Sequence, residues 1–243
     1  MTKTDIDALK IYIDNGNGLG PDPTMPETNG TLAKSARKKS IRFVLVSQGR
    51  LFCLTRDYFV QNELYNEVTG GLERKFRLIP ESIITGPAKD VILKFVSHHS
   101  IPNNSMILVQ IQTSTVTGHW GEKRRASVTG QGIHTDGHEV AAIVCLQRDG
   151  VEGAKNRFFG DLQGLKPLCD ETVLAERDAA YFIDNMLYHY VSRAWKPDEA
   201  KHDGKRSVMI LHYPADQALF GAANPHNTLG ARSKDSVVAS HKF

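Results

Sequence analysis

The sequence has little cysteine and no long apolar run. Its 243 residues include only three cysteines, Cys53, Cys145 and Cys169, and this odd, widely spaced set argues against a disulfide framework. No stretch approaches the roughly 18 apolar residues of a membrane span, and the first residues lack the apolar core of a secretory leader. We therefore expect a cytoplasmic protein that has no membrane partner.

An excess of one charge is also missing. The chain has 30 Lys and Arg residues against 27 Asp and Glu, a formal net charge of +3, and the two signs are mixed along most of its length. Binding of nucleic acid usually requires basic residues that gather on one face. The densest basic stretch, residues 34–39, is expected to be a solvated segment. We expect no nucleic-acid partner, and self-association into a homo-oligomer stays open.

The chain contains neither an internal repeat nor a glycine-rich phosphate loop, so nucleotide-binding α/β folds are not favoured. Residues 14–40 are rich in Gly, Pro and Asn, which are typical of loops. The last 29 or so residues contain few apolar side chains in sequence. We predict a partly flexible N-terminal extension over 1–40, one domain over 41–213, and a C-terminal tail or lid over 214–243.

Short β-branched and apolar runs begin at Ile41 and are separated by turn residues. The pattern predicts a hairpin around residues 48–50 and a helix over 87–99, where apolar residues recur at helical spacing. Further strands are expected at 106–112, 133–146, 179–183, 189–194 and 208–213. Many short strands with few helices favour a mainly β sandwich or barrel with flanking helices over alternating βαβ units.

The segment Gly132-Ile-His-Thr-Asp-Gly137 carries the first chemical signal. On a strand, His134 and Asp136 would face the same side and could bind one metal ion. Such a triplet is common by chance in a chain of this length, and the alternative is a solvent-facing strand end. A 2-His-1-carboxylate site needs a third ligand from a distant strand and leaves three coordination positions open. His189, in the strand-like run 188–191, is the candidate.

An arginine, Arg206, leads the last predicted strand. A guanidinium inside a barrel is costly unless an anion meets it, and its planar fork matches a carboxylate. By strand alternation, Arg206 shares one face with Val208, Ile210 and His212. The alternative is an arginine at the strand edge that reaches solvent.

Together with Gly153-Ala-Lys-Asn156 and the upstream segment 58–76, these motifs resemble the bacterial 2OG-Fe dioxygenase family that includes L-isoleucine 4-hydroxylase. The resemblance covers roughly residues 58–213. It implies a double-stranded β-helix, which is a jelly-roll, cupin-like fold, in a single domain. It also implies Fe(II), 2-oxoglutarate and O2, with hydroxylation of an unactivated C–H bond and with succinate and CO2 as co-products. The resemblance makes His134, Asp136 and His189 the iron ligands and Arg206 the anchor of 2-oxoglutarate.

The resemblance further suggests a free L-amino acid, or a similar small acid, as the substrate. The substrate carboxylate would need a cation, and Arg124 and Arg125 are the nearest candidates in the sequence. Its ammonium could use Glu139. If the strand continued past Gly137, His138 would share the face of the predicted ligands and line the mouth of the site, although a glycine there can break the alternation.

Two other classes are compatible with the residues. One is a non-catalytic, cupin-like metal-binding module, which has no need of Arg206. The other is a Zn or Mn cupin-type isomerase or hydrolase, which could share the ligands but would release no succinate and consume no oxygen.

Overall fold

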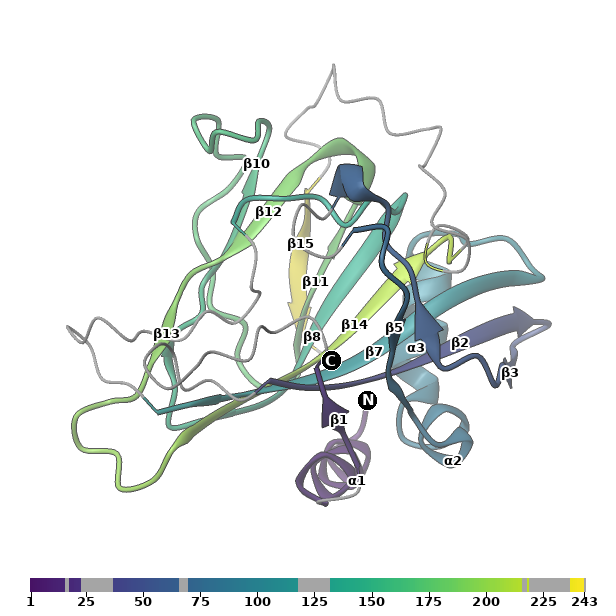
Figure 1. Cartoon of the computed structure of the whole chain (residues 1–243), viewed down its shortest axis with the longest axis horizontal. Helices are drawn as coiled ribbons and strands as arrows, with labels where there is room; N and C mark the ends of the chain where they lie inside the picture. The colour runs from purple at the N-terminus through teal and green to yellow at the C-terminus, as the bar shows by residue number, and fades with distance from the viewer. Residues whose placement is uncertain are drawn as a thin grey trace.

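A nine-stranded sheet forms the body of the protein (Figure 1). The computed structural model describes residues 1–15, 18–22, 37–65, 70–117, 132–215, 218 and 237–242, the last of these segments by its backbone alone. The main path of the sheet runs through β1 (Gly20–Pro21), β2 (Arg37–Ser47), β7 (Ser105–Val116), β14 (Gly204–Tyr213), β8 (Val140–Asp149), β11 (Asp178–Phe182) and β15 (Val237–Lys242). The strands β3 (Arg50–Cys53) and β6 (Arg77–Leu78) pair with β2, and only the pairing of β6 is parallel. The predicted hairpin is therefore present.

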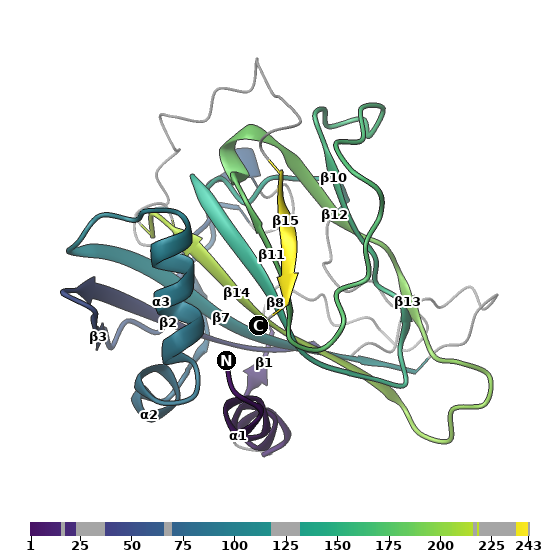
Figure 2. The ribbon, with the colours of Figure 1, turned by 180° about the vertical axis from the view of Figure 1, so that it is seen from behind.

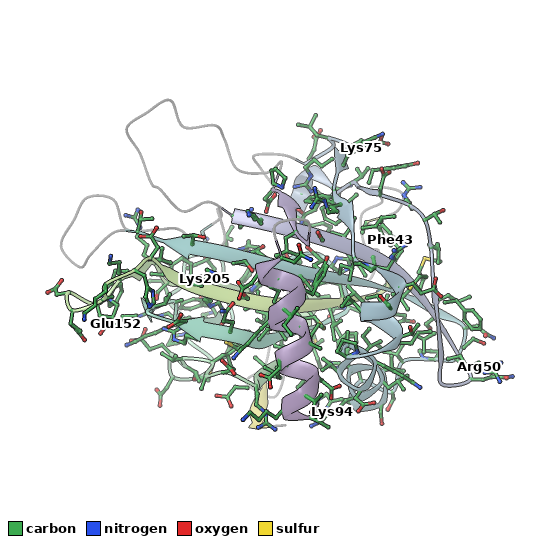
Figure 3. All side chains as sticks on the ribbon, turned by 90° about the horizontal axis from the view of Figure 1, so that it is seen from below. Phe43, Arg50, Lys75, Lys94, Glu152 and Lys205 are labelled. Atoms are coloured by element: carbon green, nitrogen blue, oxygen red, sulfur yellow. The ribbon has the colours of Figure 1, made fainter. Side chains whose placement is uncertain are left out.

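The two faces of this sheet pack against different hydrophobic clusters because its central strands are apolar on both sides. On β14, Met209 and Leu211 pack toward the helices, while Val208 and Ile210 pack into the second core. The helical side holds α1 (Lys3–Asp14), α2 (Glu81–Thr85) and α3 (Lys89–His98), as Figure 2 shows. Seen from below in Figure 3, α1 crosses the strands. The helix predicted over 87–99 is confirmed by α3.

Opposite the helices, small pairs of strands form a second layer. The pairs are β10 (Asn156–Phe159) with β12 (Tyr188–Val191), β9 (Glu152–Gly153) with β13 (Ala194–Trp195), and β4 (Tyr58–Phe59) with β5 (Arg74–Lys75). Phe158 of β10 packs with Phe182 of β11, with ring centroids 5.2 Å apart. Short 3-10 turns, η1 (Glu63–Tyr65) and η2 (Asp184–Met186), complete the described elements. The fold is mainly β with flanking helices, in the jelly-roll arrangement that the sequence predicts.

Three elements of the sheet and its helical cover, α1, β1 and β15, lie outside the predicted 41–213 domain. Helix α1 begins at a capping box between Thr2 and Asp5 and buries Ile6 and Leu9 in the main core. Strand β15 pairs with β11. The boundaries at residues 40 and 213 stay a prediction, but α1 and β15 pack with the domain. No helix in the described part of the chain is long and apolar enough to cross a membrane.

The strand predicted over 133–146 is shorter than expected, because β8 begins only at Val140. Residues 133–139 form a loop that touches β12 through one isolated bridge between His134 and His189. The break has a physical cause at Gly137, whose φ of +84° lies in the left-handed region. A Cβ at Gly137 would stand 2.3 Å from the Tyr65 ring, so only glycine fits here. The prediction that His134 and Asp136 share one face of a strand is therefore wrong.

Candidate metal centre

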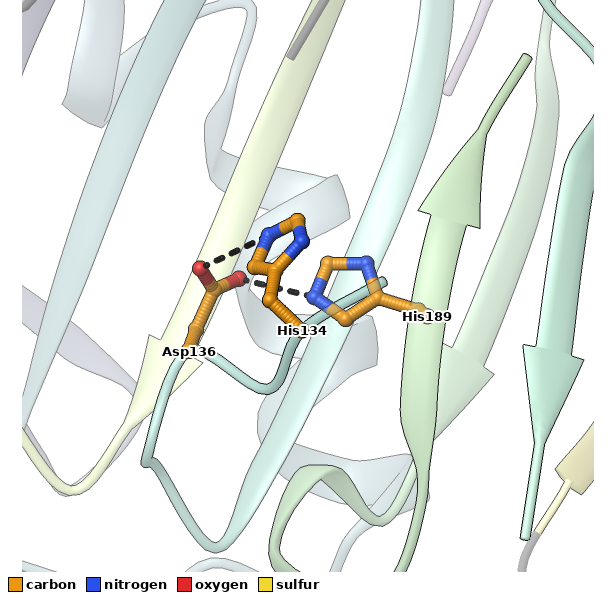
Figure 4. Close-up of side chains that lie close together, drawn as sticks. All are labelled: His134, Asp136 and His189. Carbon is orange, nitrogen blue, oxygen red and sulfur yellow. Dashed lines mark ion pairs between the residues drawn. The ribbon is translucent and has the colours of Figure 1, made fainter. Parts of the chain in front are cut away.

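Three predicted residues meet between the loop 133–139 and β12 (Figure 4). His134 Nε2 lies 3.6 Å from Asp136 Oδ1, and His189 Nε2 lies 3.3 Å from Asp136 Oδ2. Two backbone hydrogen bonds hold the histidines together, from His134 N to His189 O at 3.0 Å and back from His189 N at 2.7 Å. A loop and a strand thus bring the residues together, whereas the sequence argument relied on a strand alone.

The donor atoms suit a single metal ion. All of them lie within 4.8 Å of one another, and neighbouring ligands with bonds of about 2 Å stand roughly 3 Å apart around one ion. His189 is only 6% exposed, its Nδ1 has no hydrogen-bond partner in the part of the chain that the structure describes, and its Nε2 has none there beyond the ion pair with Asp136. Two imidazoles and one carboxylate form the facial set that suits Fe(II) and leaves open positions.

The first ligand candidate, His134, is held in the state that a metal requires. Its Nδ1 lies 2.8 Å from the carbonyl oxygen of Gly132, so Nδ1–H donates there and the lone pair of Nε2 faces Asp136. Burial, together with the neighbouring His189, lowers the pKa of His134 to about 4. The imidazole is therefore neutral at pH 7 and able to ligate.

Asp136 is oriented by residues behind the cluster. His212 Nε2 lies 3.0 Å from Asp136 Oδ2, and His212 Nδ1 lies 3.0 Å from the amide nitrogen of Gln110. The amide donates to Nδ1, so Nε2–H donates to the carboxylate. Burial works to raise the pKa of Asp136, but His189 and His212 hold it well below its usual range. The carboxylate is therefore fixed and charged.

A second aspartate, Asp184, anchors the backbone of the loop, and the sequence analysis missed it. It is fully buried at the start of η2, and its carboxylate accepts from Asp136 N–H at 3.2 Å and from His138 N–H at 2.8 Å. The hydroxyl of Thr135 donates to the Asp184 carbonyl at 2.9 Å. Burial and the charge of Asp136 raise the pKa of Asp184. The only sequence signal was an acid directly after a buried strand, at a tight turn.

Of the residues predicted to bind substrate, only His138 and Glu139 fall among the described residues. His138 does not line the mouth, because Gly137 turns it away: its Nδ1 lies 2.7 Å from Pro214 O and its ring stacks on His212 at 4.3 Å. Burial lowers the pKa of His138 to about 3. Glu139 makes its described contacts through its backbone, accepting from Asn185 N at 3.4 Å. The predictions for Arg124 and Arg125 fall outside the described residues.

Arg206 lies inside the fold on the face that alternation predicts, two residues from Val208 of the second core. Its neighbours in register are Ser114 on β7 and Arg148 on β8. The residue is 4% exposed, and its Nε and Nη2 have no hydrogen-bond partner within the described ranges. Burial lowers the pKa of Arg206 to about 10. A buried fork with unused donors fits a carboxylate ligand.

A further cation, Lys39, is half-buried although it belongs to the basic stretch that was expected to be solvated, and for the described residue Lys39 the structure corrects that expectation. Lys38 is exposed, whereas Lys39 turns toward the aromatic rings of Phe59 and Phe76. Burial lowers the pKa of Lys39 to about 8. Alternation on β2 turns this residue inward, but no motif indicates which side chains cover it.

Comparisons with known proteins agree with this geometry. A family model described as 2OG-Fe dioxygenase matches residues 14–212. The fold is similar to a bsmA homologue from Methylobium petroleophilum, with a TM-score of 0.64 and 19% identity over 86% of this chain and 83% of that one. It is also similar to IDO from Bacillus thuringiensis, with a TM-score of 0.60 and 14% identity over 86% and 82%.

A further similar structure is the Fe(II)/(alpha)ketoglutarate-dependent dioxygenase TqaL, with a TM-score of 0.55 and 15% identity over 87% of this chain and 74% of that one. At such identities these likenesses concern the fold alone. No curated protein matches the sequence.

Proposed function

Because the chain belongs to the 2OG-Fe dioxygenase family, which uses Fe(II), 2-oxoglutarate and O2, we propose that it hydroxylates an unactivated C–H bond of a free L-amino acid or a similar small substrate. Succinate and CO2 are the co-products. The observation that carries the proposal is the convergence of His134, Asp136 and His189, with all three donor atoms within 4.8 Å. These residues hold the iron, and Arg206 holds the far carboxylate of 2-oxoglutarate.

Each of these residues has a separate task. When bound, the iron supplies the activation of O2 and the oxidative decarboxylation of 2-oxoglutarate. Asp136 contributes the negative charge of the ligand set and is kept in place by the hydrogen bond from His212. His134 keeps its lone pair available because its other ring nitrogen donates to Gly132 O. Three ligands on one face leave room for the co-substrate.

The role of Arg206 separates this proposal from a metal-binding module without catalysis. A storage or sensor module gains nothing from a buried guanidinium with unused donors, whereas a dicarboxylate co-substrate satisfies them. The amino-acid class of substrate is supported by the resemblance of the motifs to the family of L-isoleucine 4-hydroxylase. A location in the cytoplasm and the formation of homo-oligomers stay predictions.

The test is an anaerobic titration of the protein with Fe(II) and 2-oxoglutarate. Chelation of the ferrous ion by the keto acid gives a weak visible absorption band, which we expect in the wild type and not in His134→Ala or Asp136→Ala. His202→Ala is the matched control, because His202 is exposed and its described contact is with Asp203. A wild-type protein without the band would overturn the proposal. Succinate release across free L-amino acids then tests the substrate class.

A further inference from the structure

The interior holds a second cationic group, separate from Arg206. Lys39 lies on β2 opposite Gln112 of β7, and Gln112 in turn lies opposite Val208 of β14. Arg206 therefore lies two strands from Lys39 and two residues further along the strand direction, so the two backbones are roughly 12 Å apart. The charged groups that influence the pKa of Lys39 are Asp22, Arg37, Arg74 and Asp136.

The neighbourhood of Arg206 is different. The groups that influence the pKa of Arg206 are Cys145 and Arg148, both on β8. Asp136, a proposed iron ligand, is among the charges that influence the pKa of Lys39. The two cations therefore have different charged neighbours.

Among the described residues, the ammonium of Lys39 has no ion-pair partner. Its described contacts are with two rings, at 5.4 Å from the centroid of Phe76 and 5.8 Å from that of Phe59. An ammonium offers three donors, and ring faces satisfy them only in part. The side chain keeps some solvent exposure, so a small ligand can reach it.

Arg74 strengthens the positive charge beside Lys39. It is 6% exposed, and its guanidinium carbon lies 4.6 Å from the centroid of the Phe59 ring. Burial lowers the pKa of Arg74 to about 10, so it remains charged at pH 7. Two cations around two aromatic rings suit an anion that is attached to an apolar body.

The segment that carries these groups also touches the candidate metal centre. Gln61, which follows β4 closely, donates from Nε2 to the Asp136 carbonyl at 3.4 Å, and the ring of Tyr65 lies against Gly137. A buried acceptor is available nearby, because Gln110 Oε1 on β7 has no hydrogen-bond partner among the described residues. A cation and an acceptor on neighbouring strands match the carboxylate and ammonium of an amino acid.

We propose that Lys39 and Arg74 form the subsite that binds the carboxylate of the amino-acid substrate, distinct from the Arg206 site for 2-oxoglutarate. This inference rests on the proposed function. The predicted cations Arg124 and Arg125 are not needed for it. Phe59 and Phe76 shield the ion pair from water, which strengthens it, and their rings border the apolar part of the substrate.

The experiment uses full-length protein with Fe(II) and 2-oxoglutarate under anaerobic conditions. Each proteinogenic L-amino acid and its carboxamide are titrated, and the perturbation of the visible band gives both dissociation constants. The wild type should bind the best acid about tenfold to a hundredfold more tightly than its amide. Lys39→Met should remove this preference, leave binding of the amide unchanged, and leave the affinity for 2-oxoglutarate unchanged. Lys39→Arg should restore most of the preference.

Lys38→Met is the matched control, because Lys38 is the exposed neighbour on the same strand and should behave as wild type. Weaker binding of 2-oxoglutarate in Lys39→Met would assign the cation to the co-substrate and overturn the inference. Equal loss of acid and amide would show a packing role and overturn it as well. A normal band that no amino acid perturbs would overturn the subsite and the substrate class but not the iron chemistry. Absence of the band in the wild type would remove the proposed function itself.

Discussion

The buried charged groups at the two ends of the inner face of β14 differ in whether they have hydrogen-bond partners among the described residues. At the His212 end, the carboxylate of Asp136 accepts from His212 Nε2 at 3.0 Å, and its backbone N–H is held by Asp184. At the other end, Arg206 has two buried nitrogens without a hydrogen-bond partner in the described part of the chain. The described residues alone complete the first end, whereas under the proposed function a ligand completes the second.

The difference separates residues that support the fold from residues that support ligand binding on the same strand. A buried charge with hydrogen-bond partners helps to fix the local structure, whereas a buried charge without partners opposes folding and is expected to be retained for binding a ligand. Substitutions at the His212 end should therefore harm both structure and metal binding. Substitutions at the Arg206 end should harm ligand binding alone.

The largest expected effect is at Arg206. Replacement by Leu should weaken binding of 2-oxoglutarate by roughly a hundredfold or more, because a buried charge pair loses one partner. The same change should leave the free energy of unfolding of the ligand-free protein unchanged or raise it by about 1–4 kcal/mol. The measurements are anaerobic titration of 2-oxoglutarate and denaturation in urea.

Arg50→Leu serves as the control for Arg206→Leu, since Arg50 is exposed at the β2–β3 turn and points outward in Figure 3. If Arg206→Leu kept its affinity for 2-oxoglutarate, the ends of β14 would not differ as argued. The non-catalytic metal-binding module would then become the better interpretation.

A smaller effect is expected at Asp184, behind the proposed iron ligands. Asp184→Asn should lower the affinity for Fe(II) by about tenfold to a hundredfold, because an amide cannot accept from both the Asp136 and His138 N–H groups as a carboxylate does. Metal affinity is measured by competition with a chelator. Asp149→Asn, at the exposed end of β8, is the control. Unchanged affinity in Asp184→Asn would mean that the loop holds Asp136 without this support.

The sequence predicted the fold class, and it predicted the residues of the triad as a group, because both depend on local patterns. Apolar runs with turn residues between them mark the strands, and a His-any-Asp motif followed by His189 is visible without a structure. The backbone geometry that brings the three triad residues together could not be predicted from the sequence. Gly137 at a φ of +84° ends the alternation, and a backbone bridge between His134 and His189 replaces it.

The surroundings of the triad depend on contacts between distant segments. Lys39 stands in a basic stretch beside the exposed Lys38, and only the position of Phe59 and Phe76 reveals that it is partly buried. Asp184 carries no motif. Helix α1 was missed although its signals are present, since Thr2 and Asp5 form a capping box ahead of buried apolar residues.

The smallest expected effect is a pH dependence that separates the two cationic sites. Lys39 has a pKa lowered by burial to about 8, so its charge is present below that pH and is lost above it. The value of kcat/KM for an amino acid should therefore fall above about pH 8, by up to about tenfold per pH unit. The pKa of about 8 already includes the effects of the charged groups around Lys39, which are Asp22, Arg37, Arg74 and Asp136.

Lys39→Arg sharpens this measurement because its guanidinium stays charged, so the fall should begin only where the substrate's own ammonium titrates. The stability of the wild type should move in the opposite direction. Because the pKa of Lys39 is lower in the folded state than its ordinary 10.5, folding disfavours the protonated form, and stability from this residue rises between about pH 8 and 10.5. A pH profile that is identical in wild type and Lys39→Arg would remove Lys39 from the substrate site and leave Arg206 as the sole anion site of the interior that the described residues support.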